Sequence, residues 1–410
     1  MGLSWEQRKL SAIADKVTEK NVGLQYIETF TNSAEFGIIS QRDFFDHDIA
    51  KMSSLGGYYI VRSEDFVYNP RISTSAPVGP INRNKLGRMG VMSPLYTVFR
   101  PHDIDTTYLE YFFKSKYWHS FMNFNGDSGA RSDRFSIKDS VFFEMPIPIP
   151  HIDEQKKIGE YLTYLDHLIT LHQRKYDKLT KVKKSMLEKM FPKNGTNVPE
   201  IRFKGFTDAW EQRKLGNVLV SLQNNTLSRA DLSNESGVAK NVHYGDVLIK
   251  FGEVLDVSKE QFPMILDESV LTKYKASFLQ NGDVIVADTA EDSTVGKCSE
   301  IAGLNDEIVL SGLHTIPYRP VENFASGYLG YYLNSDTYHN QLLPLMQGIK
   351  VTSISKSAMQ DTDIFYPKSI EEQGKISNYL QALDHLITLH QRKLEKLKIL
   401  KKAYLEKMFV

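Results

Sequence analysis

Two short loops in this sequence combine glycine with basic and hydroxyl side chains, which suits contacts to nucleic acid. One loop is Gly129-Ala130-Arg131, with Arg134 close behind it, and the other is Gly348-Ile349-Lys350, followed by Thr352 and Ser353. Guanidinium and ammonium groups bind phosphates, and Arg, Ser and Thr side chains also form hydrogen bonds to base edges. Most Arg and Lys side chains on a protein surface are only solvated, so each loop alone supports DNA binding weakly.

A second group of polar side chains lies in segments whose chemistry differs between the two halves of the chain. We expect these side chains to contact DNA together with Arg131, Arg134, Lys350, Thr352 and Ser353. In the first half of the chain they are Tyr68, Asn69, Arg71, Arg83, Lys85 and Arg88, and in the second half they are Thr289, Ser293, Thr294 and Lys297.

None of these residues completes a known catalytic motif. Asn69-Pro70-Arg71 lacks the second proline and the aromatic residue of the usual DNA methyltransferase loop, and no G-x-x-x-x-G-K-[ST] phosphate-binding loop is present. Glu154-Gln155-Lys156 resembles the end of a nuclease motif, but the equivalent Glu372-Gln373-Gly374 lacks the lysine, and both fit the start of a helix better. We therefore expect no catalytic residue, no metal site and no cofactor bound by this chain.

Length and composition indicate a multidomain protein. The 410 residues predict two or three domains, and a single cysteine, Cys298, excludes an internal disulfide and favours the cytoplasm. No apolar run approaches the roughly 18 residues that span a membrane. The net charge is zero, which counts against a simple electrostatic DNA binder. DNA binding would then require basic residues gathered on one face.

The sequence is an internal duplication. Residues 152–191 align with residues 370–409 without a gap, and 27 of the 40 positions are identical, including the run LDHLITLHQRK in both. WEQRKL at Trp5 recurs at Trp210, and further shared landmarks stand 217 to 220 residues apart. The segments between landmarks differ in most polar residues. Two copies of one scaffold with different loops suggest two related tasks on two targets.

The duplicated segments have the heptad period of long packed helices. A helix of 40 residues would be about 60 Å long, and its apolar stripe needs a partner, for which the other copy is the nearest candidate. Dimerisation between chains remains the alternative. His172 and His390 lie on this stripe, where a packed histidine is favoured over a metal ligand. The predicted helix-pair interface comprises Ile158, Leu162, Leu165, Ile169, His172, Leu179, Ile376, Leu380, Leu383, Ile387, His390 and Leu397.

The segments before the helices predict α+β domains with curved sheets. Apolar runs at 58–61, 66–68, 284–286 and 308–310 are typical of strands, and 108–118 and 328–338 are typical of short helices. Pro146 to Pro150 form an extended approach to the first long helix. The expected divisions are 1–151, first domain; 152–191, first long helix; 192–209, linker; 210–369, second domain; and 370–410, second long helix.

This order of elements resembles the specificity subunit of type I restriction–modification systems. The resemblance rests on the WEQRKL openings and on Ile152-Asp153-Glu154-Gln155-Lys156-Lys157-Ile158 with its twin Ile370-Glu371-Glu372-Gln373-Gly374-Lys375-Ile376. It covers essentially the whole chain, because the order, the spacing and the duplication all agree.

The resemblance implies a role in DNA recognition without catalysis. Each α+β domain would be a target-recognition domain that reads one half of a bipartite, asymmetric site in double-stranded DNA, and the helices would form an antiparallel coiled-coil pair that sets the gap. Two methyltransferase subunits and the restriction–translocase subunits would be the partners, and they would carry S-adenosylmethionine, ATP and Mg²⁺. The alternatives are a non-catalytic protein-interaction scaffold with a coiled-coil spacer and an autonomous DNA-modifying enzyme, which the missing motifs disfavour.

Overall fold

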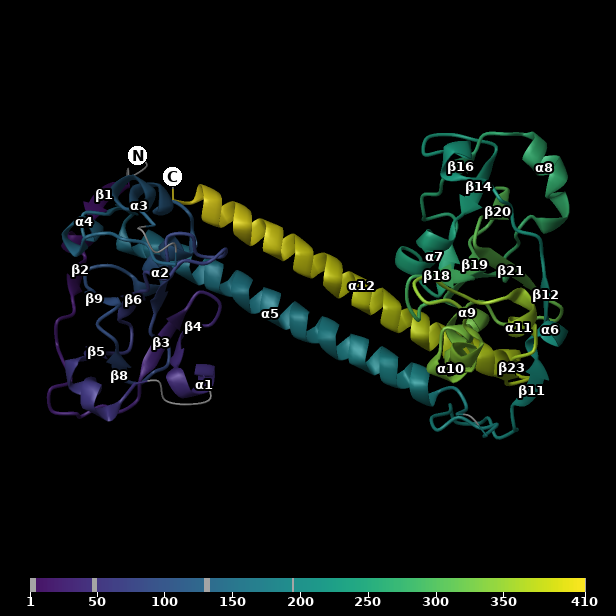
Figure 1. Cartoon of the computed structure of the whole chain (residues 1–410), viewed down its shortest axis with the longest axis horizontal. Coiled ribbons are helices and arrows are strands. Elements are labelled where there is room, and N and C mark those ends of the chain that lie inside the picture. Colours follow the sequence, from purple (N-terminus) through teal and green to yellow (C-terminus); the bar gives the residue numbers. More distant parts are fainter. Residues whose placement is uncertain (1–4, 46–49, 129–132, 194, 410) are drawn as a thin grey trace. The chain divides into compact units, whose positions relative to one another are not determined.

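The computed structural model describes residues 5–45, 50–128, 133–193 and 195–409, and the chain divides into two compact units (Figure 1). Unit 1 comprises residues 1–173 and 392–410, and unit 2 comprises residues 174–391. Each long helix therefore contributes one end to each unit.

Unit 1 is built from short strands and helices before the first long helix. Its strands are β1 (Glu6–Lys9), β2 (Ala14–Lys16), β3 (Phe30–Ser33), β4 (Gly37–Ser40), β5 (Tyr59–Val61), β6 (Phe66–Tyr68), β7 (Ile81–Arg83), β8 (Gly90–Met92), β9 (Thr97–Pro101) and β10 (Pro146–Ile149). Its short helices are α1 (Gln41–Phe45), α2 (Thr106–Lys114), α3 (His119–Asn125) and α4 (Asp139–Phe142), and the long helix α5 spans Ile152–Lys189.

Unit 2 repeats this plan with more strands. Its strands are β11 (Glu211–Lys214), β12 (Leu219–Ser221), β13 (Leu232–Ser233), β14 (Ala239–Val242), β15 (Val254–Asp256), β16 (Met264–Ile265), β17 (Val284–Ala287), β18 (Thr289–Ala290), β19 (Cys298–Ala302), β20 (Val309–Ser311), β21 (Thr315–Pro320), β22 (Thr352–Ser353) and β23 (Asp363–Tyr366). Its helices are α6 (Leu215–Val218), α7 (Tyr244–Ile249), α8 (Ser269–Lys273), α9 (Tyr328–Leu333), α10 (Asp336–Leu342), α11 (Lys356–Gln360) and α12 (Ile370–Lys407).

The two units share one sheet topology, which confirms the duplication and the α+β class. The main sheet of unit 1 has the order β2-β9-β6-β7, and that of unit 2 has the order β12-β21-β17-β19 with β15 added at its edge. In each unit the EQRK strand pairs antiparallel with the strand that leads into a long helix, β1 with β10 and β11 with β23. The repeated WEQRKL motif is thus a strand that fastens the start of each half to its helix.

One buried ion pair occurs at the same place in both halves of the chain. Asp65 accepts two hydrogen bonds from Arg100, and Asp283 accepts the same pair from Arg319, at distances of 2.7–2.9 Å. Both carboxylates are buried, so each requires its guanidinium partner.

The glutamine of the EQ motif joins each long helix to its domain. The Gln155 side chain accepts a hydrogen bond from the backbone N–H of Asp105 and donates one to the carbonyl of Pro150. Gln373 does the same with Ala325 and Pro367. The EQ motif is therefore a buried fastening at a helix start, and this role fits its presence in both halves.

The apolar stripe of each long helix packs on two partners, whereas the sequence indicated only the other helix. Ile158, Leu162 and Leu165 of α5 lie in the core of unit 1 with Tyr108 and with Phe409, which follows α12. Their counterparts Ile376, Leu380 and Leu383 lie in the core of unit 2 together with Met190 and Phe191, which follow α5. The start of one helix therefore packs beside the end of the other, so the pair is antiparallel, and each helix start also covers its own domain.

Candidate nucleic-acid interface

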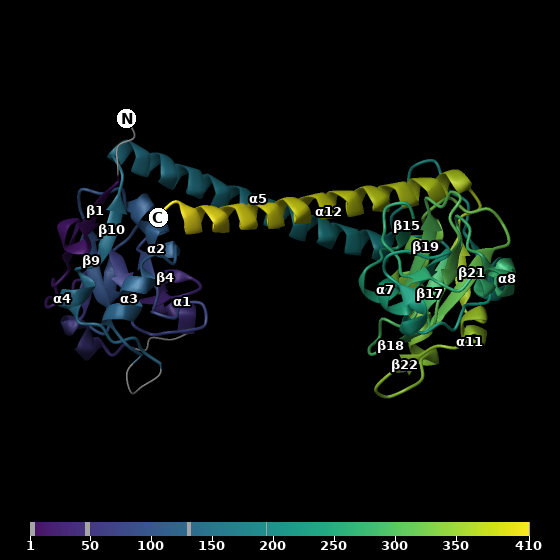
Figure 2. The same cartoon turned by 90° about the horizontal axis from the view of Figure 1, so that it is seen from above.

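The structure brings the two predicted loop groups together in both domains. In unit 1, Arg71 and Arg134 form an antiparallel bridge, so the segment after β6 lies beside the segment that ends the glycine–arginine loop. In unit 2, β18 and β22 pair antiparallel, with Thr289 opposite Ser353 (Figure 2). The same two places in the fold meet in each domain, although their side chains differ.

In both domains, an antiparallel bridge also joins the two sides of the glycine-containing loop. Asp127 bridges Ser136 in unit 1, and Gln347 bridges Ser353 in unit 2. Gly348 has φ +116°, and a Cβ there would stand 2.0 Å from the carbonyl oxygen of Val351, so only glycine fits. Arg131 lies outside the described residues.

In unit 1 the joined loops border a hollow of about 350 Å³. Arg71 and Arg134 line it, and both guanidinium groups stand 3.9–4.0 Å from the carboxylate of Asp133. The Arg71 side chain is 69% exposed and that of Arg134 is 43% exposed, which leaves both able to contact a ligand. The full lining is Thr31, Asn32, Ser33, Ala34, Phe44, Phe45, Asn69, Pro70, Arg71, Ile72, Ser73, Pro80, Leu95, Tyr96 and Arg134.

Asn69 lines the hollow and also holds the backbone of this site. Its Oδ1 accepts the N–H of Arg71 at 3.0 Å, and its Nδ2 donates to the carbonyl of Asn32 at 2.8 Å. The carbonyl of Asn69 also packs against Gly79, where a Cβ would approach to 2.2 Å. These contacts fix the direction in which Arg71 leaves the strand.

The equivalent place in unit 2 offers hydroxyl groups and one ammonium group. Thr289 donates to Asp288 at 2.8 Å, and the exposed Lys350 stands in the loop that β22 closes. Thr294 donates to Asp292, and this hydrogen bond lowers the pKa of the Asp292 carboxyl. The side chain of Ser293 is exposed, while its carbonyl contacts His339. The second interface is therefore less basic than the first.

Two residues that we predicted as DNA contacts are instead part of the protein interior. Tyr68 is 3% exposed, donates its hydroxyl proton to the carbonyl of Val78 and stacks on Phe142. Burial raises the pKa of the Tyr68 hydroxyl well above its usual range. Arg83 is 8% exposed and is paired with Glu110 at 2.6 Å. Neither side chain reaches the surface in this conformation.

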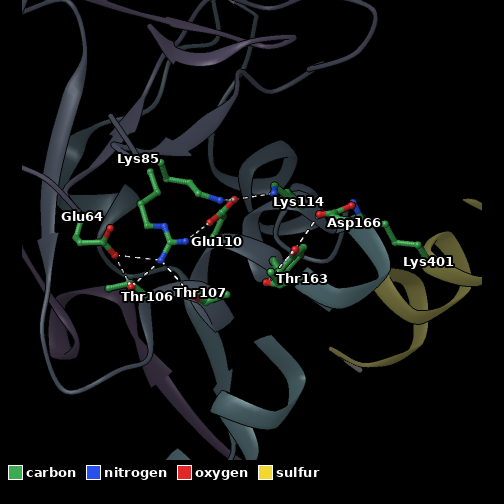
Figure 3. Close-up of polar contacts among 11 residues, drawn as sticks. Glu64, Lys85, Thr106, Thr107, Glu110, Lys114, Thr163, Asp166 and Lys401 are labelled. Atoms are coloured by element: carbon green, nitrogen blue, oxygen red, sulfur yellow. Dashed lines mark hydrogen bonds and ion pairs between the residues drawn. The ribbon is translucent and has the colours of Figure 1, made fainter. Parts of the chain in front are cut away.

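The ion-pair network around Glu110 links Arg83 in the sheet of unit 1 to α2, and Figure 3 labels Glu110 with its partners Lys85 and Lys114. Arg83 also contacts Glu64 and donates a hydrogen bond to Thr106. The carboxylate of Glu110 lies 3.3 Å from the ammonium group of Lys85 and 2.6 Å from that of Lys114. Lys85 is 60% exposed and can still face solvent. These cations lower the pKa of Glu110 against the effect of its burial.

Two further predicted contacts are held by protein partners. Arg88 is half exposed, but its guanidinium makes two bonds of 2.7–2.8 Å to Glu28, which raise the pKa of Arg88. Lys297 is half-buried and donates to the carbonyl of Leu248, and burial lowers its pKa. Contacts to DNA by either residue would first require these bonds to break.

Side chains that the sequence did not single out also belong to the candidate interface. Phe44 and Phe45 line the hollow of unit 1, and their side chains are 40% and 36% exposed. Ile349 is fully exposed in the glycine-containing loop of unit 2. Adjacent aromatic residues after polar Gln41 and Arg42 were a usable signal, but α1 is too short to show a period.

Two kinds of feature are absent from the described part of the chain. No group of three or more His, Cys, Asp or Glu side chains there could hold a metal ion. No helix there is long and apolar enough to cross a membrane.

Comparison with known proteins identifies the repeated unit. A family profile for the type I restriction modification DNA specificity domain matches residues 5–181 and again residues 207–399. The chain is 26% identical over 331 residues to the type I restriction enzyme MjaVIII specificity subunit of Methanocaldococcus jannaschii, covering 77% of this chain and 73% of that protein. It is 24% identical to the putative MjaX specificity subunit of the same organism, covering 65% of this chain and 59% of that one.

Solved structures show the same fold. One similar chain comes from work on complex assembly and conformational transition of the type I R-M system, with 16% identity, coverage of 99% and 97%, and a TM-score of 0.51. Another is the type I restriction-modification system S subunit from M. genitalium, with 13% identity, coverage of 100% and 96%, and a TM-score of 0.51. With the family profile matched twice along most of the sequence, the chain belongs to the type I restriction modification DNA specificity family and carries two copies of its domain.

Proposed function

We propose that this chain reads DNA for a type I restriction–modification complex, with each domain contacting one half of a bipartite, asymmetric site. The observation that carries the proposal is the pairing of the same two loops in both domains, Arg71 with Arg134 and Thr289 with Ser353. A common frame with different side chains suits recognition of two different sequences, because base edges are distinguished by donor and acceptor groups.

The two long helices would each dock one copy of a methyltransferase subunit. Their shared run LDHLITLHQRK keeps exposed residues identical as well as packed ones, although packing within the chain does not require this. Leu171 and Leu389, for example, are 37% and 38% exposed. The other exposed identical pairs are His167 and His385, Thr170 and Thr388, Arg174 and Arg392, and Lys175 and Lys393. Two equal surfaces suit two copies of one partner.

Catalysis would then lie on the partner subunits. S-adenosylmethionine would be bound by the methyltransferase subunits, and ATP and Mg²⁺ by the restriction–translocase subunits. The chain would supply the sequence at which they act and, through the length of its helices, the gap between the half-sites. Its purified form should neither methylate nor cut DNA.

The test is methylation mapping in cells that carry this chain with its methyltransferase subunit. The proposal predicts one motif with two defined half-sites and an unread gap, which disappears when this chain is omitted. Binding of the purified complex to duplex DNA should weaken steeply with salt, and Lys350→Ala should reduce the salt slope by about one. A complex whose methylation pattern does not depend on this chain would rule out the DNA-reading role in favour of a protein-interaction scaffold.

A further inference from the structure

Three exposed phenylalanines gather beside the hollow of unit 1. Phe44 and Phe45 lie on α1 with ring centroids 4.6 Å apart, and the ring centroid of Phe36 lies 6.2 Å from that of Phe44. Their exposed fractions are 62% for Phe36, 40% for Phe44 and 36% for Phe45. Exposed aromatic side chains that contact one another form an apolar patch, and such patches usually mark a binding surface.

The same hollow carries two guanidinium groups on a rigid backbone. Arg71 and Arg134 are opposite partners in an antiparallel bridge, and Asn69 fixes the N–H of Arg71. Opposite residues in such a pair lie about 4.5–5.5 Å apart, which is comparable to the 3.4 Å rise between base pairs. Among the described residues, Asp133 is the one carboxylate within 4.0 Å of both groups, so the positive charge there is only partly balanced.

The partner of this surface must therefore accept hydrogen bonds from arginine and also present an apolar group. An apolar protein surface would leave two guanidinium groups unsatisfied, at a cost in free energy. The major groove of DNA offers both features, because guanine presents O6 and N7 as acceptors and thymine presents a methyl group. Charge and apolar character together favour duplex DNA over a protein ligand.

We propose that the hollow of unit 1 reads base edges in the major groove, with Arg71 and Arg134 on guanine and with Phe44 and Phe45 against a thymine methyl group. This inference rests on the proposed function and adds to it the chemistry of one half-site. The half-site of unit 1 thus contains at least one G·C pair and a nearby A·T pair.

The first experiment uses the full chain in complex with its methyltransferase subunit. Methylation mapping gives the two half-sites, and binding is then measured on duplexes that carry them. Arg71→Ala and Arg134→Ala should each weaken binding to the wild-type site roughly 5- to 150-fold and relax specificity at one G·C pair of the same half-site. Arg62→Ala is the matched control, because Arg62 is 47% exposed in the same unit and does not line the hollow. It should leave the motif unchanged.

The second experiment removes the methyl group of each thymine in that half-site by replacing thymine with uracil. One replacement should weaken binding by the wild-type complex about fourfold, the worth of one buried methyl group. Phe44→Ala combined with Phe45→Ala should abolish this difference, whereas Phe124→Ala should keep it. Phe124 is 89% exposed in unit 1 and does not line the hollow.

Two results would overturn the inference while leaving the proposed function intact. One is a bipartite motif that depends on this chain but keeps both half-sites unchanged in Arg71→Ala and Arg134→Ala. The other is equal affinity of the wild-type complex for every thymine and uracil duplex. Loss of the proposed function would look different, because the methylation pattern would then be independent of the whole chain.

Discussion

The ammonium group of Lys183 lies 2.6 Å from Oδ1 of Asp384, and the duplicated pair, Lys401 with Asp166, lies at 2.5 Å in unit 1. Each aspartate also accepts the hydroxyl of a domain tyrosine, Tyr331 in unit 2 and Tyr111 in unit 1. In both units, therefore, one aspartate in the first half of a long helix connects the other helix to the domain (Figure 3 shows the Asp166 example). The two ties differ because Lys183 also contacts Glu253 at 2.7 Å.

This difference predicts unequal effects of the same substitution. Asp166→Asn removes the only carboxylate that the described part of unit 1 places on Lys401, and it should destabilise unit 1 by about 1–3 kcal/mol. Asp384→Asn should cost less, because Lys183 keeps Glu253. Burial and then repulsion from Glu253 raise the pKa of Asp384, and the amide relieves both effects. Hydrogen exchange of α2 and α9 in the full chain measures the two losses separately, and equal losses would contradict this account.

Arg83 should contribute to stability rather than to DNA contact. Arg83→Ala leaves Glu110 buried with one strong partner fewer, and the expected loss of unfolding free energy is about 3 kcal/mol. Lys85→Ala removes an exposed partner of the same carboxylate and should cost less than about 1 kcal/mol. Thermal unfolding of both variants provides the comparison. If the Arg83→Ala protein is stable but binds DNA poorly, Arg83 contacts DNA and this prediction is wrong.

The buried carboxyl group of Glu300 should make the stability of unit 2 depend on pH. Its carboxylate is 2% exposed and accepts the N–H groups of Gly327 and Gly330, and burial outweighs these bonds and raises its pKa to about 7. Because the folded pKa exceeds the unfolded value near 4.5, the native state holds the extra proton between these two pH values. Stability from this group is full below pH 4.5 and falls by up to about 3 kcal/mol as the pH rises to 7.

Urea unfolding of unit 2 between pH 4.5 and 8 checks this slope. Glu300→Gln should lose that part of the pH dependence, while Glu291→Gln, an exposed position in the same unit, should keep it. If the wild-type protein and Glu300→Gln show the same pH profile over this range, the carboxyl group is already ionised at pH 4.5.

The sequence predicted those parts of the fold that depend on repetition and period. The antiparallel helix pair and the α+β domains follow from the heptad stripe and from short apolar runs. The roles of Asp65 with Arg100 could not be read in advance, because the two halves repeat the residues without showing that they touch. Burial of Tyr68 and Arg83 was missed for a similar reason. Arg83 is buried only because Glu110 reaches it from another element, and a sequence does not show such a contact.

The candidate site was predicted in part. The two loop groups came from residue types, yet their meeting depends on a bridge between Arg71 and Arg134, which are far apart in the sequence. Phe44 and Phe45 gave no periodic signal, and their exposure is visible only in the folded domain. Local patterns find charged loops, whereas the three-dimensional fold decides which loops share a surface.

Because the two halves are duplicated, a second copy of the first half could replace the second half in the helix packing. In unit 1, Phe409 packs on Tyr108 and Phe112, and in unit 2 its counterpart Phe191 packs on Tyr328 and Tyr332. Phe191 and Lys183 of a second copy could therefore take the places of Phe409 and Lys401. A fragment of residues 1–195 exposes an apolar stripe that needs such a partner, so it should form a two-fold symmetric homodimer.

Methylation mapping with this fragment and the methyltransferase subunit tests the central claim, that each domain reads one half-site. Light scattering should first give the mass of a dimer. The account predicts methylation of a palindrome made from the unit 1 half-site and its inverse, because two identical domains would then read the DNA. A folded monomer would show that the helices do not pair as described. A dimer that still directs methylation to the original asymmetric site would contradict the assignment of one half-site to each domain.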